Sequence, residues 1–236
     1  MSDQIKTFKE ELAGNPYAGR GVLVGVTPDG KRSAIAYFIM GRSENSRNRV
    51  FVKDGDDLMI KPFDESKVED PSLIIYYPLR VTEKAIVVTN GDQTDTVRDH
   101  LAAGGSFESA LRTRTFEPDG PNWTPRISGI SYPDGSCTIS ILKCTDGEGI
   151  KASRQFFDYD PVPGTGRLIH TYVTDGKPLP TFVGEPKAVA VPEDPKAFAD
   201  EIWETLDDNN KISLYVRYTD LETGKYEDII VNKHER

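Results

Sequence analysis

Three arginines fall within eight residues of a chain whose formal net charge is −9: Arg42, Arg47 and Arg49. They follow the apolar run 34–40, which is typical of a buried strand. The cluster therefore leaves the end of a rigid element, where loops that contact ligands usually lie. A guanidinium donates two parallel hydrogen bonds to a phosphate or carboxylate, so the pattern indicates a site for a local anion. The alternative is a solvated surface loop in which these arginines only form ion pairs with the aspartates of segment 54–57.

A second polar segment, Asn90 to Asp95, joins the apolar run 85–89 to the predicted start of a helix. Backbone amides at such a helix start can hold an anion or a polarised oxygen. Asn-Gly is also a common turn pair. A turn followed by a helix cap is therefore the alternative for this segment.

Two further positions could take part in chemistry. Tyr76 ends another apolar run, where a tyrosine more often belongs to the core or its rim than to a catalytic site. The loop from Glu117 to Arg126 contains two carboxylates and three prolines, and a surface loop stiffened for stability is its alternative explanation. The sequence has no glycine-rich phosphate loop, nucleophile elbow or histidine triad. Any chemistry must therefore come from arginine, tyrosine, carboxylates, asparagine and backbone amides.

The composition limits the class of protein. At 236 residues the chain suits one large domain or two small ones, and 37% hydrophobic with 28% charged residues fits a soluble globular protein. No apolar run approaches the roughly 20 residues of a membrane helix. The first residues lack the basic start and apolar stretch of a secretory signal. A pI near 5.0 argues against general nucleic-acid binding, which needs a broad basic face.

The cysteines and histidines indicate no metal site. Cys137 and Cys144 bracket one predicted strand, and their odd separation places the two side chains on opposite faces. They can then neither pair in a disulfide within the strand nor share a metal. The three histidines are widely spaced and no zinc pattern occurs. We expect a cytoplasmic, metal-free protein.

Strands must position these groups. Residues 21–26 and the run from Ser33 enclose Pro28-Asp29-Gly30, which predicts a hairpin, and Pro133-Asp134-Gly135 predicts a second one leading into 136–143. Further strands are predicted over 72–81, 84–89, 153–158, 167–173, 212–219 and 226–232. The runs 35–40 and 74–77 are continuously apolar, so we expect them to be covered on both faces. Segment 212–218 alternates in polarity and should be half exposed.

Helices are fewer. Thr94 to Thr96 could cap a helix that runs to about Ala103, and Ser106 could cap a second helix through Leu111. A third helix should begin at Asp194 with Pro195 in its first turn, and it places Phe198, Ile202 and Leu206 on one stripe beside Trp203. The proline- and glycine-rich segment 161–195 is expected to be a long irregular connection and a partial domain boundary. These elements favour an α+β protein with stacked, mainly antiparallel sheets flanked by helices.

A series of short motifs occurs in order between about residues 15 and 130: Gly19-Arg20, Tyr37, Gly41-Arg42-Ser43 with Asn48-Arg49, Asp70-Pro71 with Tyr76 and Arg80, Thr89 to Asp95, and Thr124-Pro125-Arg126-Ile127. In order and spacing this set resembles the archaeal-type IMP cyclohydrolases. The second half of the chain adds little to the match. The first fourteen residues look unlike the short archaeal members, so we predict an extension over 1–14 and a single domain over 15–236.

The resemblance implies a four-layer αββα sandwich like that of the N-terminal nucleophile hydrolases. It also implies the last step of de novo purine synthesis, in which a formamido-imidazole-carboxamide ribonucleotide loses water to give IMP. That reaction needs a phosphate anchor, a ring-closing rotamer and groups that polarise the formyl oxygen and accept a proton. It requires no metal or redox cofactor. The expected partner is a small purine ribonucleotide, not a nucleic acid or a membrane, and a homo-oligomer is left open.

The resemblance also implies roles for particular residues. Arg42 would polarise or anchor the substrate, Tyr76 would donate or accept a proton, and Glu117 would orient the carboxamide or relay a proton. The residues expected to bind the substrate are Arg20, Tyr37, Arg49, Asn90, Gly91, Asp92 and Arg126.

Two other functions stay open at this point. A non-catalytic purine-nucleotide-binding or regulatory protein could use the same scaffold, because a fold does not determine a function. An amide hydrolase is suggested by the fold analogy alone. It would need a nucleophile at the start of the first strand, whereas Ser2 lies far ahead of that strand.

Overall fold

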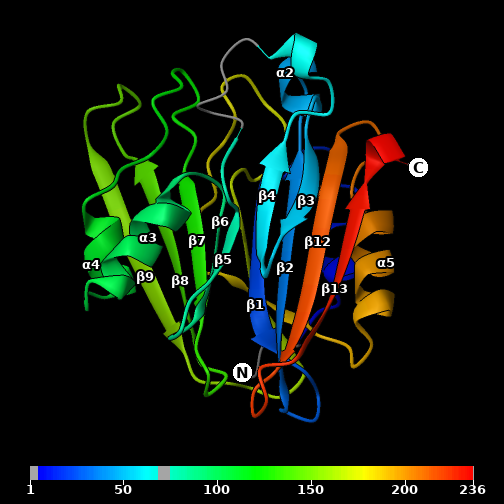
Figure 1. Cartoon of the computed structure of the whole chain (residues 1–236). Helices are drawn as coiled ribbons and strands as arrows, with labels where there is room; N and C mark the ends of the chain where they lie inside the picture. The colour runs from blue at the N-terminus through cyan, green and yellow to red at the C-terminus, as the bar shows by residue number, and fades with distance from the viewer. Residues whose placement is uncertain (1–4, 69–74, 236) are drawn as a thin grey trace.

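Two antiparallel β-sheets packed face to face form the centre of the computed structural model, which describes residues 5–68 and 75–235 (Figure 1). The first sheet has the strand order β11-β10-β1-β2-β12-β13. Its strands are β1 Arg20–Val26, β2 Arg32–Met40, β10 Thr165–His170, β11 Lys187–Ala190, β12 Lys211–Asp220 and β13 Tyr226–Asn232.

The second sheet has the order β3-β4-β5-β6-β7-β8-β9. Its strands are β3 Val50–Asp54, β4 Asp57–Lys61, β5 Leu79–Val81, β6 Ile86–Thr89, β7 Arg126–Ser131, β8 Cys137–Cys144 and β9 Ala152–Tyr159. The helices are α1 Phe8–Leu12, α2 Glu44–Arg47, α3 Gln93–Ala102, α4 Phe107–Arg112 and α5 Pro195–Thr205, with 3-10 turns η1 Glu65–Lys67 and η3 Lys233–Glu235.

Both predicted hairpins are confirmed. β1 pairs with β2 and β7 pairs with β8, each antiparallel. Gly30 and Gly135 adopt φ values of 69° and 84° in the two turns. Only a residue without a β-carbon takes these values readily, so the Pro-Asp-Gly sequences fix both turns and the register of both strand pairs.

The side chains of β2 show how the layers are built. Ile35, Tyr37 and Ile39 pack between the two sheets. The alternate residues, such as Ala36 and Phe38, pack instead beneath α1 and α5. The prediction that this run is covered on both faces is therefore confirmed.

The outer face of the second sheet packs against α3 and α4 (Figure 1), with Val87 and Ile130 buried beside helix residues. Helices thus flank two stacked antiparallel sheets, as predicted, and the α+β class is confirmed. The likeness to the N-terminal nucleophile hydrolases stays a prediction, as does the domain boundary at residue 15.

Helix α5 begins where its sequence predicts. The Asp194 side chain caps it by accepting a hydrogen bond from the Lys196 amide, Pro195 occupies the first turn, and Phe198 and Ile202 are buried. Ser106 caps α4, also as predicted. α3 starts at Gln93 with Asp92 in the N-cap position, slightly before the predicted cap at Thr94.

The prediction that segment 212–218 is half exposed is wrong. β12 is buried from Lys211 to Tyr218, because it lies between β2 and β13 and is covered on both faces. Its polar side chains are paired internally. Ser213 Oγ donates to Asn232 Oδ1 at 2.7 Å, and Arg217 Nη1 donates to the Asp56 carbonyl at 2.8 Å. Because these polar groups have hydrogen-bond partners inside the protein, they can be buried away from water.

Two other expectations need correction. Of the predicted strand 72–81, residues 72–74 lie outside the described residues, 75–78 are not in a strand, and only Leu79–Val81 forms β5. Ile75 is 36% exposed, so full coverage of 74–77 is also wrong. Segment 161–195 is not irregular throughout, because β10 and β11 within it belong to the first sheet.

Cys137 and Cys144 are free and lie at the two ends of β8, with Cys137 in the core between the sheets. Within residues 5–68 and 75–235 no cluster of three or more histidine, cysteine or acidic side chains could hold a metal ion. None of the helices in these ranges is long and apolar enough to cross a membrane.

Candidate active site

One end of the sandwich gathers polar side chains from five separate segments. Arg20 starts β1 and lies opposite Ile39 near the end of β2. Tyr37 comes from β2 and Arg49 immediately precedes β3. The other contributors are Tyr76, just ahead of β5, and Glu117, in the loop before β7. These residues are distant in sequence, and the pairing of the strands brings them together.

The two tyrosines share a hydrogen bond between the sheets. The hydroxyls of Tyr37 and Tyr76 lie 2.9 Å apart and both side chains are buried. Burial, together with the neighbouring Tyr76, raises the pKa of Tyr37 well above its ordinary value. Tyr37 therefore stays neutral near pH 7, and its hydroxyl can donate to or accept from that of Tyr76.

Arg20 faces the carboxylate of Glu117. Arg20 Nη2 lies 3.7 Å from Glu117 Oε2, and Arg20 Nε is buried with no hydrogen-bond partner among the described residues. Burial disfavours the positive charge, but Glu117 and the surrounding tyrosines outweigh that penalty and raise the pKa of Arg20. The free Nε leaves a donor for a bound molecule.

Arg49 is a buried cation with little compensation. Its Nε donates to the Ser46 carbonyl at 2.7 Å, and it forms no ion pair within the part of the chain that the structure describes. Burial, followed by repulsion from Arg20, lowers the pKa of Arg49. A buried charge without a counterion is costly. The site therefore favours an anionic ligand that would supply the missing negative charge.

Glu117 is positioned to carry a proton. Its backbone amide donates to the Thr124 carbonyl at 2.9 Å, which closes the rigid loop ahead of β7. Burial raises the pKa of its carboxyl group, although the charges of Arg20 and Arg126 act in the opposite direction. A carboxyl group whose pKa is moved toward neutrality can accept and return a proton.

Gly91 allows a close approach of side chains beside Glu117. A β-carbon at this position would lie 2.5 Å from Arg126 Nη1, 2.6 Å from Gln93 Oε1 and 3.6 Å from Glu117 Oε1. Arg126 Nη1 donates to Gln93 Oε1 at 2.7 Å and pairs with Asp92 Oδ1 at 2.7 Å. The segment that starts α3 therefore fixes Arg126 at the edge of the cluster.

Asn90 has a different environment from the one expected of a residue that touches substrate. Its Oδ1 accepts from the Ile127 amide and from Gln93 Nε2, both at 2.9 Å, and its Nδ2 donates to the Pro125 carbonyl at 2.9 Å. These bonds tie the end of β6 to the start of β7. The geometry supports a positioning role for the side chain.

The sequence pattern of the family described as "IMP cyclohydrolase-like protein" matches residues 17–225. The chain belongs to this family. The IMP cyclohydrolase of Methanopyrus kandleri is 33% identical over 162 residues, which are 62% of this chain and 78% of that protein.

Two other relatives in the IMP cyclohydrolase-like family are covered less fully. The IMP cyclohydrolase of Methanocaldococcus jannaschii is 34% identical over 132 residues, 55% of this chain and 63% of that protein. The one from Methanocella arvoryzae is 35% identical over 119 residues, 48% of this chain and 57% of that protein. The match therefore spans less than two thirds of these two relatives.

Arg42 lies at the rim of this family member's cluster. It pairs with Asp175, donates to the Gly176 carbonyl at 3.2 Å, and its guanidinium carbon lies 4.9 Å from the centre of the Tyr17 ring. Tyr17 in turn stacks on Tyr172. Arg42 thus contacts an aromatic pair whose members lie in the electrostatic fields of Arg49 and Arg20. None of the three clustered arginines pairs with the aspartates of segment 54–57, so that alternative is wrong.

Asp92 also has protein partners. Its carboxylate is 53% exposed and bridges Arg114 and Arg126 at 2.5 and 2.7 Å. Burial opposes ionisation, but the two arginines outweigh it and lower the pKa of Asp92.

Sequence reasoning missed Tyr172. Its hydroxyl lies 2.5 Å from Thr124 Oγ1, its ring stacks on Tyr17, and it lies in the electrostatic field of Arg20. Tyr172 follows β10, which pairs with β1, so Tyr172 reaches the cluster only through sheet pairing. No motif surrounds it in the sequence that could have identified it.

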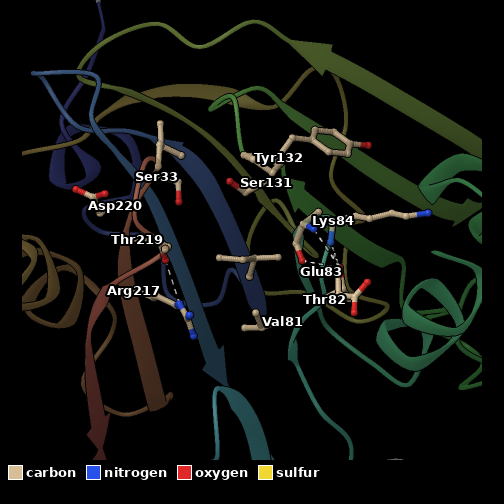
Figure 2. Close-up of a pocket in the computed structure, with 15 residues that line it drawn as sticks. Ser33, Val81, Thr82, Glu83, Lys84, Ser131, Tyr132, Arg217, Thr219 and Asp220 are labelled. Carbon is tan, nitrogen blue, oxygen red and sulfur yellow. Dashed lines mark hydrogen bonds between the residues drawn. The ribbon is translucent and has the colours of Figure 1, made fainter. Parts of the chain in front are cut away.

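A cleft of about 180 Å³ lies at the other end of the sandwich. Figure 2 shows Ser33, Ser131 and Arg217 among its lining residues. Ser33 is at the start of β2 and Ser131 at the end of β7, whereas the polar cluster uses the opposite ends of those strands. None of the predicted site residues lines this cleft.

Proposed function

We propose that the chain is an IMP cyclohydrolase, which closes the purine ring by dehydrating 5-formamidoimidazole-4-carboxamide ribonucleotide to IMP in the last step of de novo purine synthesis. Family membership supports this function. The observation that carries it to this site is the buried Arg49, which forms no ion pair with any described residue and lies in the electrostatic field of the Arg20–Glu117 pair. A nucleotide phosphate matches that unbalanced charge, and the expected partner is thus a small purine ribonucleotide. Cytoplasmic localisation stays a prediction.

The reaction needs one addition and one elimination. The carboxamide nitrogen attacks the formyl carbon, which forms the new C–N bond, and the formyl oxygen takes up a proton. Elimination then removes this oxygen as water. Of the two hydrogens in that water, one comes from the carboxamide nitrogen and the other from the formamide nitrogen. No electrons are transferred, so acid–base groups and a fixed substrate conformation are sufficient.

The cluster supplies groups for these steps. In our proposal Glu117 accepts the carboxamide proton, and Tyr76, supported by Tyr37, donates to the formyl oxygen. Arg20 would stabilise negative charge that develops on that oxygen. Arg49 would bind the phosphate.

The remaining predicted site residues lie at the edges of this cluster. We propose that Arg42 and Arg126 bind the ribonucleotide at the edge of the cluster. Because Gly91 has no β-carbon, it leaves room for the Arg126 side chain. Asn90 and Asp92 would hold the loop and Arg126 in place.

Turnover is the first measurement. Purified protein is incubated with the formamido-imidazole-carboxamide ribonucleotide in the presence of a chelator and without folate, and IMP is quantified by chromatography. Conversion above the uncatalysed rate is the expected result. Failure to convert, together with thermal stabilisation by IMP, would instead identify a non-catalytic nucleotide-binding protein.

The tyrosine assignment is tested by Tyr76→Phe, which removes only the hydroxyl. We expect kcat to fall by about 10²-fold or more, the lower range for a general acid, while the protein stays folded. Tyr77→Phe is the matched control, because its hydroxyl binds Asp54 at 2.6 Å, outside the cluster. Equal rates for the two variants would remove Tyr76 from the mechanism.

A further inference from the structure

The direction in which the Arg49 side chain points depends on one tight turn. α2 ends at Arg47, and the next residue, Asn48, has φ −79° and ψ 52°. The Arg49 amide donates to the Arg47 carbonyl at 2.9 Å. These values describe an inverse γ-turn, the reversal that often stands at the start of a strand. The turn leads the chain from α2 into β3 and so determines where the Arg49 side chain points.

His234 binds the same carbonyl. Its Nε2 lies 2.8 Å from the Arg47 oxygen. A carbonyl can only accept, so Nε2 carries the hydrogen and fills the second lone pair of that oxygen. The imidazole also stacks on Phe63 with ring centres 4.3 Å apart, and the Phe63 amide donates to the Asn48 carbonyl at 3.3 Å. The imidazole ring is therefore bonded to Arg47 directly and linked to Asn48 through Phe63.

Asn232 holds the chain beyond Arg49. This buried carboxamide accepts from the Phe51 amide at 2.8 Å and donates to the Phe51 carbonyl at 3.0 Å. It thus pairs with the main chain of β3 as a neighbouring strand would. Ser213 and Glu235 satisfy its remaining bonds. These two bonds join β13, at the edge of the first sheet, to β3 of the second sheet, two residues after Arg49.

We propose that Asn232 and His234 are positioning residues that hold Arg49 in place for the substrate anion. One binds the main chain two residues before Arg49 and the other two residues after it. Both lie beyond residue 225, where the family match ends, and the C-terminal turn lies at the same end of the molecule as α2 (Figure 1). This inference rests on the proposed function, because it concerns binding of the nucleotide by Arg49.

A double-mutant cycle tests the coupling. The dissociation constant for IMP is measured by calorimetry for the wild-type protein, His234→Phe, Arg49→Ala and the double variant. Phenylalanine keeps the stacking on Phe63 but removes the donor. We expect His234→Phe to weaken IMP binding about two- to tenfold, the usual effect of one lost hydrogen bond, and to have no further effect once Arg49 is absent. KM should rise with little change in kcat.

Two variants separate positioning from general stability. His234→Gln keeps an N–H donor and should restore most of the affinity. His100→Phe is the matched control, since the His100 ring also contacts a carbonyl, that of Thr96 at 3.0 Å, but within α3. Asn232→Ala should show the same dependence on Arg49 as His234→Phe.

The outcomes distinguish the two proposals. An active wild-type enzyme in which His234→Phe is silent, or weakens IMP equally with and without Arg49, overturns the positioning role alone. A wild-type protein with neither turnover nor IMP binding overturns the proposed function and this inference together.

Discussion

Glu117 is the residue on which the proposed proton transfer depends most directly. It lies in the field of three arginines, Arg20, Arg126 and Arg49, yet burial dominates and its pKa is raised. Glu117→Gln keeps the shape and removes the ionisable group. We expect kcat to fall about 10²- to 10⁴-fold, the usual contribution of a general base, while KM changes little. Steady-state kinetics check this against Glu108→Gln, an exposed control paired with Arg112 on α4. Comparable kcat values would show that Glu117 carries no proton.

The same carboxyl group should leave a signature in the pH dependence of stability. Its pKa is higher in the folded state than its ordinary value of 4.5, so the folded protein binds the proton more tightly than the unfolded chain does. The contribution of Glu117 to the free energy of unfolding is then complete below about pH 4.5 and is lost as pH rises through the folded-state pKa. Urea titrations between pH 4 and 7 should show a decline in stability that is smaller in Glu117→Gln. Parallel pH profiles for the two proteins would contradict this prediction.

At the scale of elements, the turn between β6 and α3 matters because it is packed without spare space. Gly91→Ala would place a methyl group 2.5 Å from Arg126 Nη1 and 2.6 Å from Gln93 Oε1. Arg126 must then move, together with its bonds to Gln93 and Asp92. We expect kcat/KM to fall about 10- to 100-fold, since small displacements of binding groups are costly, with the fold retained.

Kinetics and circular dichroism of Gly91→Ala provide the measurement. Gly104→Ala is the control, because a β-carbon there would meet no atom within 4 Å, and its kcat/KM should stay near that of the wild type. Unchanged kinetics for Gly91→Ala would show that Arg126 tolerates displacement.

For the whole molecule, α1 contributes to stability rather than to chemistry. Phe8 is fully buried beneath the first sheet and meets Phe38 edge to face, with ring centres 6.0 Å apart. Phe8→Ala should lower the free energy of unfolding by about 3–5 kcal/mol, the range for a buried aromatic, and leave kcat unchanged. Denaturant titration checks this against Ile5→Ala, whose side chain is 44% exposed. A small loss for Phe8→Ala would place α1 outside the cooperative fold.

Local patterns predicted the elements well where neighbouring residues decide the structure. The Pro-Asp-Gly turns, the Asp194 and Ser106 caps and the doubly covered β2 follow from backbone preferences and from apolar runs. The alternation in β12 was misleading, because its polar side chains are buried and paired with residues far away in sequence. A pattern of polarity reports exposure only when polar groups lack internal partners.

The sequence by itself determined the class of fold and the hairpins, because short-range preferences are local. Its resemblance to the archaeal-type IMP cyclohydrolases indicated most of the residues that form the polar cluster. The tertiary structure alone decided how these residues are arranged. It paired Arg42 with Asp175, occupied the Asn90 side chain with backbone bonds, and added Tyr172 through the pairing of β10 with β1. Burial, charge repulsion and hydrogen-bond partners depend on strands that meet only after folding, so no local pattern could have predicted them.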